Sequence, residues 1–452
     1  RNDIIALEQD RGSVLLVDRA SGALERVLSG ADLVTNGPGV ASPDDVGEGA
    51  DFGALAAGSM VSPPYGREVF IAGLRSGPTG FEPVRLYAID VFTGERRVLN
   101  DTELELGPFE TRVWSNGFPS IQLDSAGDLV VANGNANGTR VFRFDPRTGD
   151  AQILGDTRVG DGFRIEDPRD ALLVDDDTLL VTAGRFNGAF TFRVDLTTGD
   201  RELIGWHDQS LDVTLREWEN GEQIMPVRLN VTDVPGRGAV GGSSGNLYIG
   251  SVDGEVYVGH VGQYPGGPND FEGCLVRFDP ATGRRDLVLG TAYRSIGRVA
   301  VGPVSRMPPA NDTGFRFENA DTVIGGPDGR LWFNDRFGSD ALFAFDVVSR
   351  EVEAVAELRT QVASGWVFGA FDPEAGLRIR DFVFYNGTVC SGDFDGDGSV
   401  DLDDFGAFGA SFGAVSGEAG FDTRADLDRD GDIDLGDFGA FGVQFGRTDC
   451  LE

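Results

Sequence analysis

Short runs of alternating apolar and polar residues recur along residues 1–385, and the same short sequence of turn-forming residues follows each of them. An aspartate closes the run, and four residues later comes a glycine, preceded by a serine or threonine. Alternation with a period of two predicts a strand. An aspartate accepts hydrogen bonds from the amides that follow it, and glycine tolerates a positive φ, so each copy predicts a hairpin turn between two strands. The copies lie at Asp18–Gly22, Asp90–Gly94, Asp145–Gly149, Asp195–Gly199, Asp279–Gly283 and Asp346–Arg350, the last without its glycine.

Two further apolar segments precede most of these turns. Gly127–Asn133 and Gly329–Asn334 predict one more strand, and Ile121–Asp124 and Ala171–Val174 predict another before it. Four short strands in a repeat of about 50 residues are typical of a propeller blade. The six copies predict six blades, while the long gaps at 30–66 and 200–244 leave a seventh blade open.

The two ends of the repeat region complete each other. The segment that begins at Asp3 reads as the second strand of a blade, and Leu377–Tyr385 reads as the missing first strand. Pairing these strands would remove the open sheet edges that invite aggregation. We therefore expect the ring to close through its termini.

The turn sequence Phe-Asp-Pro-x-Thr-Gly, present at Phe144–Gly149 and Phe278–Gly283, resembles that of a large group of secreted bacterial β-propellers. The resemblance covers residues 1–385 and implies a mainly β fold, with a propeller domain over residues 1–387. It implies no particular activity, because propellers carry many unrelated functions.

A different pattern begins after residue 390. The segment Asp393–Asp404 has the spacing of an EF-hand loop, with carboxylates at loop positions 1, 3, 5, 9 and 12, a glycine at position 6 and Val400 at position 8. Asp426–Asp437 repeats this pattern 33 residues later. Carboxylates at this density repel one another unless a cation lies among them. The sequence therefore predicts two Ca²⁺ sites.

Three features of these loops resemble a type I dockerin: aspartate instead of glutamate at position 12, the short spacing, and no helix before the first loop. The resemblance implies a small all-α calcium-binding module at residues 388–452, with a disulfide between Cys390 and Cys450. It also implies a protein partner. Positions 10 and 11 are Leu402-Asp403 and Leu435-Gly436, which differ from the family's Ser-Thr or Lys-Arg pairs that recognise cohesins. The implied metal ligands are Asp393, Asp395, Asp397, Ser399, Asp401, Asp404, Asp426, Asp428, Asp430, Asp432, Asp434 and Asp437, with Ser399 and Asp432 contributing backbone carbonyls.

A run of phenylalanines at positions i, i+3 and i+7 follows each loop, which places the three rings on one face of a helix. The two sets are Phe405, Phe408 and Phe412, and Phe438, Phe441 and Phe445. A core stripe is the preferred interpretation, and a partner-binding stripe is the alternative.

The charge of the chain narrows the class of partner. The net charge is −36, and all 38 basic residues are arginine. Such a surface repels nucleic acid and anionic lipid, so we expect neither as a partner. No apolar run reaches the length of about 18 residues that a membrane span needs. The first residue is Arg1, which suits a mature chain after removal of a signal peptide, and we expect an extracellular, secreted protein.

Catalytic motifs are scarce. The two histidines, His207 and His260, stand in no recognisable motif. Some six-bladed propellers that resemble this chain hydrolyse lactones with calcium in their central channel, and Asp175 or Glu217 could serve there.

We therefore favour a non-catalytic scaffold that assembles through its calcium module, with copies of itself, as a filament or lattice, or with a cohesin-like domain. The alternative is a hydrolase or lyase acting on a polysaccharide or lactone, docked to a larger complex by the same module. A third hypothesis is a carbohydrate-binding propeller, which would need Trp114, Trp206 and Trp366 on one exposed face.

Overall fold

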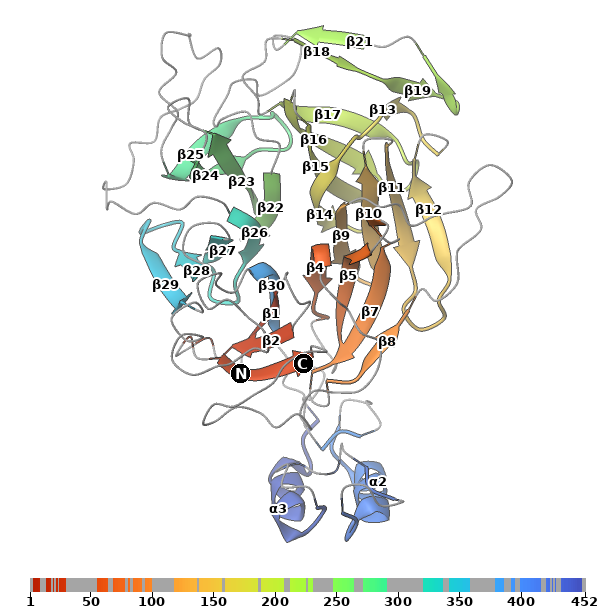
Figure 1. The fold of residues 1–452 in the computed structure, drawn as a ribbon, viewed down its shortest axis with the longest axis vertical. Coiled ribbons are helices and arrows are strands. Elements are labelled where there is room, and N and C mark those ends of the chain that lie inside the picture. The colour runs from red at the N-terminus through yellow and green to blue at the C-terminus, as the bar shows by residue number, and fades with distance from the viewer. Residues whose placement is uncertain are drawn as a thin grey trace.

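The computed structural model shows a ring of β-sheets with two helices outside it (Figure 1). It describes the chain apart from residues 1–2, 9–13, 18, 20–21, 23, 30–54, 64–67, 78–79, 82–83, 92–93, 100–117, 136–137, 157–158, 186–187, 207–211, 225–226, 231–246, 264–270, 291–319, 336–340, 358–378, 386–391, 395–398, 416–419, 423–424, 426, 428–431 and 449–452.

Six sheets of the described residues contain four antiparallel strands in meander order, named here from the inside of the ring outward. The first sheet has β30 (Ile379–Tyr385), β1 (Asp3–Glu8), β2 (Val14–Val17) and β3 (Leu24–Ser29). The second has β4 (Leu55–Val61), β5 (Glu68–Gly77), β7 (Arg85–Asp90) and β8 (Arg96–Val98), and β6 (Gly80–Phe81) pairs with β5. The third has β9 (Phe118–Leu123), β10 (Leu129–Asn135), β11 (Gly138–Phe144) and β12 (Ala151–Gly155).

The remaining three sheets repeat this order. The fourth has β14 (Pro168–Asp175), β15 (Thr178–Arg185), β16 (Gly188–Asp195) and β17 (Arg201–Trp206). The fifth has β22 (Leu247–Val252), β23 (Glu255–Gln263), β24 (Phe271–Phe278) and β25 (Arg285–Gly290). The sixth has β26 (Ala320–Gly325), β27 (Leu331–Asp335), β28 (Ala341–Phe345) and β29 (Val352–Glu357).

The innermost strands form a closed circuit in which β30, β4, β9, β14, β22 and β26 each contact the next, and β26 contacts β30. The termini close it as expected, because β1 pairs antiparallel with β30 from Asp3↔Tyr385 to Glu8↔Ile379. The mainly β propeller is therefore confirmed by strand order and register.

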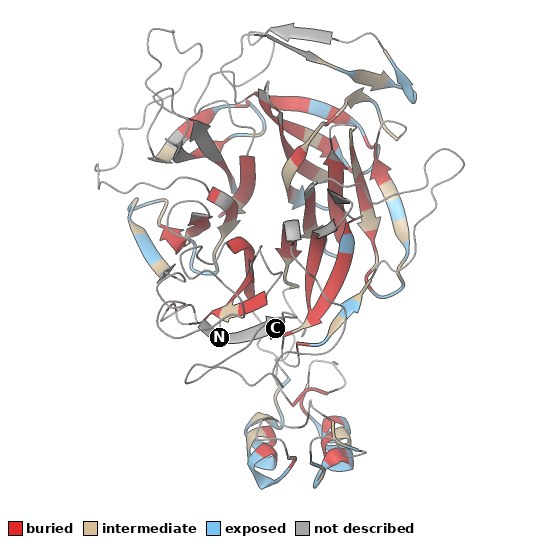
Figure 2. Cartoon of the chain, viewed as in Figure 1, coloured by how far each residue is buried: buried red, intermediate tan, exposed pale blue. Residues whose placement is uncertain are grey.

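The core of the ring lies between neighbouring sheets (Figure 2). Successive side chains of a strand point to opposite faces, so Ile4 packs toward Trp332 of the sixth sheet while Ile5 packs toward Ile71 of the second. Equivalent apolar clusters join each of the other neighbouring pairs of sheets. Both faces of a strand are therefore buried against neighbouring sheets, which is why the strands are rich in apolar residues.

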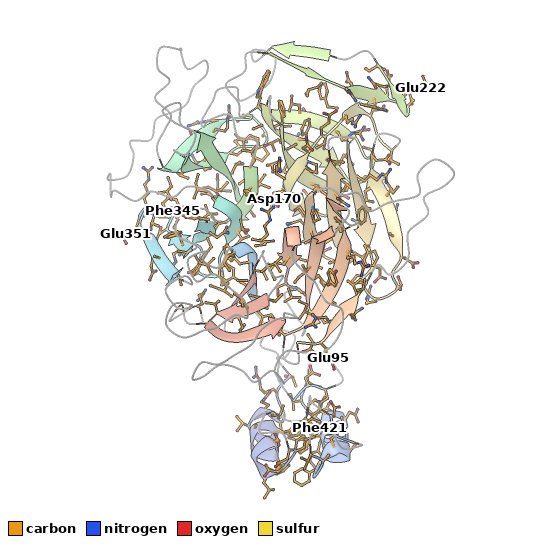
Figure 3. The ribbon with its side chains drawn as sticks, in the orientation of Figure 1. Glu95, Asp170, Glu222, Phe345, Glu351 and Phe421 are labelled. Carbon is orange, nitrogen blue, oxygen red and sulfur yellow. The ribbon has the colours of Figure 1, made fainter. Side chains whose placement is uncertain are left out.

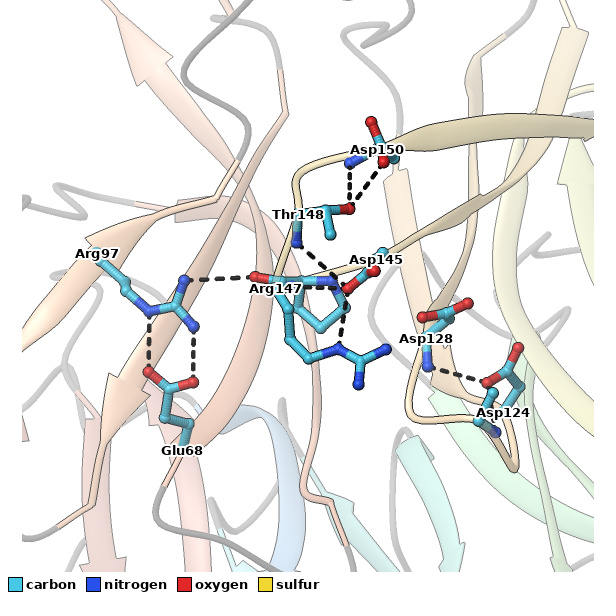
Figure 4. A network of polar contacts seen from close by, with 10 residues as sticks. Glu68, Arg97, Asp124, Asp128, Asp145, Arg147, Thr148 and Asp150 are labelled. Carbon is cyan, nitrogen blue, oxygen red and sulfur yellow. Dashed lines mark hydrogen bonds and ion pairs between the residues drawn. The ribbon is translucent and has the colours of Figure 1, made fainter. Parts of the chain in front are cut away.

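The aspartate turns have the predicted geometry. At Asp145, Oδ1 accepts from the amide of Arg147 at 2.8 Å, and Gly149 has a φ of +80°. In the sixth copy Arg350 replaces glycine at a φ of +63°. Backbone hydrogen bonds lower the pKa of Asp145, and they lower the pKa of Asp346 in the same way. Arg97 of the second sheet, paired with Glu68, reaches the carbonyl of Pro146 in the Asp145 turn and so links two sheets at their outer ends (Figure 4).

The two long gaps hold no seventh four-stranded sheet in the part of the chain that the structure describes. In 30–66 the described strand is β4, which belongs to the second sheet. In 200–244 the described strands extend the fourth sheet or pair with each other. At the edge of β17, the fourth sheet continues with β13 (Gly162–Phe163), which precedes this sheet in the sequence, and then with β19 (Glu217–Glu219) and β20 (Glu222–Gln223). The strands β18 (Asp212–Leu215) and β21 (Val227–Asn230) pair with each other in a separate two-stranded sheet.

Arg201 fixes this extension to the ring. Its buried guanidinium donates to the carbonyls of Asp156, Val159, Gly199, Gly160 and Phe163 at 2.6–3.1 Å. The two helices that follow the ring are α2 (Leu402–Ser411) and α3 (Leu435–Gln444). Neither of these described helices has the length or the apolar character that crossing a bilayer requires.

Candidate functional site

Both C-terminal helices begin with the same capping arrangement, built from loop positions 9 and 12. Asp401 caps α2 by accepting from the amide of Asp403 at 2.9 Å, and Asp404 Oδ2 accepts from the amide of Asp401 at 2.9 Å. Asp434 and Asp437 repeat this capping box at α3. Each acidic loop is therefore joined rigidly to the start of its helix.

The position-12 aspartates are fully buried, with 0% of their surface exposed. Asp404 Oδ1 accepts from the amide of Phe394 at 2.6 Å, and Asp437 Oδ1 accepts from the amide of Leu427 at 2.5 Å. Each carboxylate thus joins the beginning of its loop to the beginning of its helix. Because each oxygen has two lone pairs, a carboxylate held in this way can still bind a metal ion.

The second loop brings three of the predicted residues into one cluster. Ligand oxygens of Asp432, Asp434 and Asp437 all lie within 4.8 Å of one another. Calcium binds oxygen ligands at about 2.3–2.6 Å, so a single ion can span oxygens with this separation. The donor set contains only hard oxygen atoms, which suits Ca²⁺ better than a thiophilic metal. These residues therefore fit calcium, with Asp432 at position 7 contributing a carboxylate to the cluster where only its backbone carbonyl was expected.

The first loop is described in part. Asp393 is buried, and Ser399 donates through Oγ to Asp401 Oδ2 at 3.2 Å. The other members of the predicted ligand set and of the predicted disulfide lie outside the described residues; they are Asp395, Asp397, Asp426, Asp428, Asp430, Cys390 and Cys450.

A stack of phenylalanine rings holds the two helices together. Phe408 and Phe441, each 1% exposed, stack at 5.4 Å between ring centroids, and Phe394 stacks on both. Phe421, on the segment between the helices, packs against the edge of this cluster (Figure 3). The central phenylalanine of each helical stripe is therefore core, whereas the flanking rings, such as Phe412, are about half exposed.

The catalytic candidates do not gather. Asp175 is exposed at the end of β14, and Glu217 lies on β19, on the far side of the same sheet. His260 lies on β23, where its backbone pairs with Leu247 and Cys274, and its side chain is not described. His207 lies outside the described residues. Of the tryptophans considered for carbohydrate binding, Trp206 is fully buried, and Trp114 and Trp366 are not described.

Sequence reasoning missed a set of polar residues on the innermost strands, which we call the collar: Ser59, Ser120, Asp170, Tyr248, Thr322 and Asp381. Four of these side chains, those of Ser59, Ser120, Asp170 and Asp381, accept from an amide of the next innermost strand. Ser120 Oγ accepts from the amide of Ala171 at 2.9 Å, and Asp170 Oδ2 accepts from the amide of Ile249 at 2.9 Å. An innermost strand has no partner on its inner edge, so these bonds satisfy amides that the sheets leave unpaired.

Two collar residues are carboxylates from opposite sides of the circuit, Asp170 of the fourth sheet and Asp381 of the first (Figure 3 labels Asp170). Asp381 accepts from the hydroxyl of Thr322 at 2.8 Å and from the amide of Met60 at 2.7 Å. Burial raises the pKa of Asp170 to about 7 and the pKa of Asp381 to about 6, while these hydrogen bonds act in the opposite direction. The charge of Asp381 also raises the pKa of Asp170.

A signal for the collar exists in the sequence. In five of the six repeats, a polar residue directly precedes the apolar run of the first strand, as in Ser120-Ile, Asp170-Ala and Asp381-Phe. This polar residue can be recognised only when the repeats are aligned by their first strands. The turn sequence instead aligns the repeats by their last two strands.

Comparisons with known proteins identify no family. No family model matches the sequence, and the search of characterised proteins gives no match. Among solved structures, the chain is similar to a chain of the nidogen/laminin complex, with 10% identity over 85% of this chain and 98% of that one and a TM-score of 0.44. TolB from Acinetobacter baumannii matches with 12% identity over 78% of this chain and 65% of that one, at a TM-score of 0.41. A putative 6-phosphogluconolactonase from Bacteroides fragilis matches with 12% identity over 85% and 98%, at a TM-score of 0.39.

Proposed function

We propose that this protein is a secreted, non-catalytic, six-bladed propeller that assembles outside the cell through a calcium-binding, dockerin-like module at residues 388–452. The partner is another copy of the chain or a cohesin-like domain. Calcium would be held by the two acidic loops and would supply the positive charge that keeps their carboxylates together. The closed circuit of six innermost strands supports the blade number.

The distribution of exposed apolar side chains carries this proposal. Among the described residues, ten large hydrophobic side chains are exposed, and only Val174 and Val348 of these belong to the ring. The other eight lie on α2, on α3 or within four residues after them, and they are Leu402, Phe405, Phe412, Val415, Leu435, Phe438, Val443 and Phe445. Apolar residues gathered in this way mark interaction surfaces, whereas single ones on a surface need no explanation.

The loop positions that differ from cohesin-binding dockerins are part of this surface. Leu402 and Leu435 both stand at loop position 10, on the first turns of α2 and α3, and they are 72% and 74% exposed. A leucine at this position offers apolar contact where a serine or lysine would offer a hydrogen bond. We therefore place the partner contact on the first turns of the helices.

An enzymatic role draws no support from the described residues. Asp175 and Glu217 lie apart, and the collar carboxylates Asp170 and Asp381 are occupied by amides and hydroxyls of the neighbouring sheets. Side chains used in this way hold blades together, which fits a structural subunit.

Replacing both Leu402 and Leu435 with serine is expected to weaken partner binding at least about tenfold, because two exposed apolar contacts are removed without disturbing the core. Sedimentation of the full chain, alone and with a type I cohesin domain, in millimolar calcium and in EDTA, measures this. The matched control is Val348→Ser, at a valine of the ring that is 87% exposed, which should leave binding unchanged.

Three outcomes decide the proposal. Calcium-dependent growth of the chain into larger species supports self-assembly, and calcium-dependent binding of the cohesin supports a cohesin-like partner. A monomer in calcium that binds no cohesin, or a double-serine variant that assembles like the unchanged chain, contradicts it.

A further inference from the structure

The two C-terminal repeats hold each other through a reciprocal set of backbone hydrogen bonds. Val400, at position 8 of the first loop, donates its amide to the carbonyl of Arg447 and accepts from the amide of Gly446, each at 2.8 Å. Gly446 and Arg447 directly follow α3, the helix of the second repeat. The first loop is therefore held by the end of the second helix.

The second loop is held in the same way, 33 residues along the chain. Ile433, at its position 8, donates its amide to the carbonyl of Ala414 at 2.9 Å and accepts from the amide of Gly413 at 2.7 Å. Gly413 and Ala414 follow α2, the helix of the first repeat. Val400 and Ile433 are both fully buried, so these clamps lie within the core of the two repeats.

We infer that the two metal loops are coupled through these crossed clamps, so that the segment after each helix controls the cation affinity of the other repeat's loop. This inference rests on the calcium binding proposed above. The residues that form the clamps are not metal ligands. Each clamp belongs to one repeat in the sequence but holds the loop of the other repeat.

A rigid connection carries the effect from one loop to the other. A cation in the first loop would be held by Asp401 and Asp404, which form the capping box of α2, and would restrict the start of that helix further. The helix is ten residues long, about 15 Å, and its far end presents Gly413 and Ala414 to Ile433. Ordering the start of α2 therefore orders the clamp on the second loop. The same path runs through α3 to Val400, and linkage makes the coupling equal in both directions.

Two glycines allow the clamps to be weakened selectively. Gly413 and Gly446 adopt φ values of +87° and +86°, a conformation that an L-amino acid adopts at a cost. A Cβ atom added at either position meets no atom within 4 Å. Alanine there would act through backbone strain at the clamp and not through a steric clash.

The experiment measures calcium binding by calorimetry in the full chain, with one loop disabled at a time. Asp395→Asn with Asp397→Asn leaves the second loop, and Asp428→Asn with Asp430→Asn leaves the first. Gly413→Ala is expected to weaken the second loop about fivefold or more and the first loop much less, whereas Gly446→Ala is expected to do the reverse. Gly406→Ala and Gly439→Ala, helical positions with open space around the added carbon, are the matched controls and should weaken neither loop.

The outcomes separate this inference from the function it rests on. The crossed pattern supports the clamps. If each alanine weakens its own repeat's loop, or both loops equally, the crossed coupling is wrong while calcium binding stands. If the unchanged chain binds no calcium, both the inference and the proposed function fail.

Discussion

Replacing Phe441 with alanine is expected to destabilise the packed pair of C-terminal helices by about 3–5 kcal/mol, which is the usual cost of emptying a phenylalanine site in a core. Phe441 is 1% exposed and contacts the rings of Phe394, Phe405 and Phe408 at centroid distances of 5.4–6.0 Å. Among the described residues, the core of these repeats has six buried apolar residues, so few neighbouring side chains can move in to fill the cavity. We expect α2 and α3 to lose structure together and calcium affinity to fall with them.

Hydrogen exchange of the full chain in calcium, read by mass spectrometry, locates this effect. Amides of α2 and α3 should lose protection in Phe441→Ala, while the strands of the ring keep theirs. Phe445→Ala is the matched control, because Phe445 lies one turn further along at 48% exposure and its loss should cost about 1 kcal/mol or less. Equal protection in the two variants would show that the phenylalanine stack does not hold the helices.

The ring itself is expected to unfold more easily at pH 8 than at pH 5, by about 2–4 kcal/mol. The cause is the pair of collar carboxylates, since burial raises the pKa of Asp170 to about 7 and that of Asp381 to about 6. A carboxyl whose pKa is raised by folding binds more protons in the native state than in the unfolded state. Stability therefore falls as the pH rises from the unfolded value near 4 through these folded values.

Below this pH window, the stability of the ring falls as the pH is lowered. Backbone hydrogen bonds lower the pKa of the turn residue Asp195, and the hydroxyl of Thr282 lowers that of Asp279, so protonating them on acidification removes stability. We expect stability to be greatest near pH 5. Among the described residues, Arg380 is a charged group that faces the collar; it donates to the hydroxyl of Tyr248, and its charge lowers the pKa of Asp381.

Denaturant unfolding of the ring, followed by tryptophan fluorescence between pH 5 and pH 8, measures this dependence. The residues predicted to form the C-terminal module contain no tryptophan, so the signal belongs to the propeller. Exchanging both Asp170 and Asp381 for asparagine should flatten the profile, whereas Asp175→Asn, an exposed change on the same strand, should leave it unchanged. A double variant with the full pH dependence would assign the effect to other groups, such as the two histidines.

Local chemistry explains why some features could be predicted from residues alone. The turn at Asp145 depends on bonds between residues at most five apart, and the capping box at Asp401 joins residues three apart. The closure of β1 on β30 could also be predicted, because a blade that lacks a strand at one end of the chain needs one from the other end. For the turn and the capping box, a short segment contains all the information that the structure requires.

Contacts between repeats could not be predicted in this way. The bond from Met60 to Asp381 joins residues 321 positions apart, and it forms only because the ring closes. The Arg201 guanidinium bonds the carbonyl of Phe163 in β13, part of a strand extension that no repeat pattern indicates. The crossed clamps on Val400 and Ile433 follow from the way the two helices pack, since backbone groups there carry no sequence signal.

The sequence by itself therefore determined the strands, their turns and the helix caps, because periodicity and local hydrogen bonding depend on neighbouring residues. It also indicated the closing pair, because each end of the chain supplies the strand that the other lacks. Tertiary structure alone decided which polar side chains are buried at the centre of the ring, and which helix end holds which loop. Those outcomes depend on desolvation and on unpaired amides, and both arise only when distant strands and helices come together.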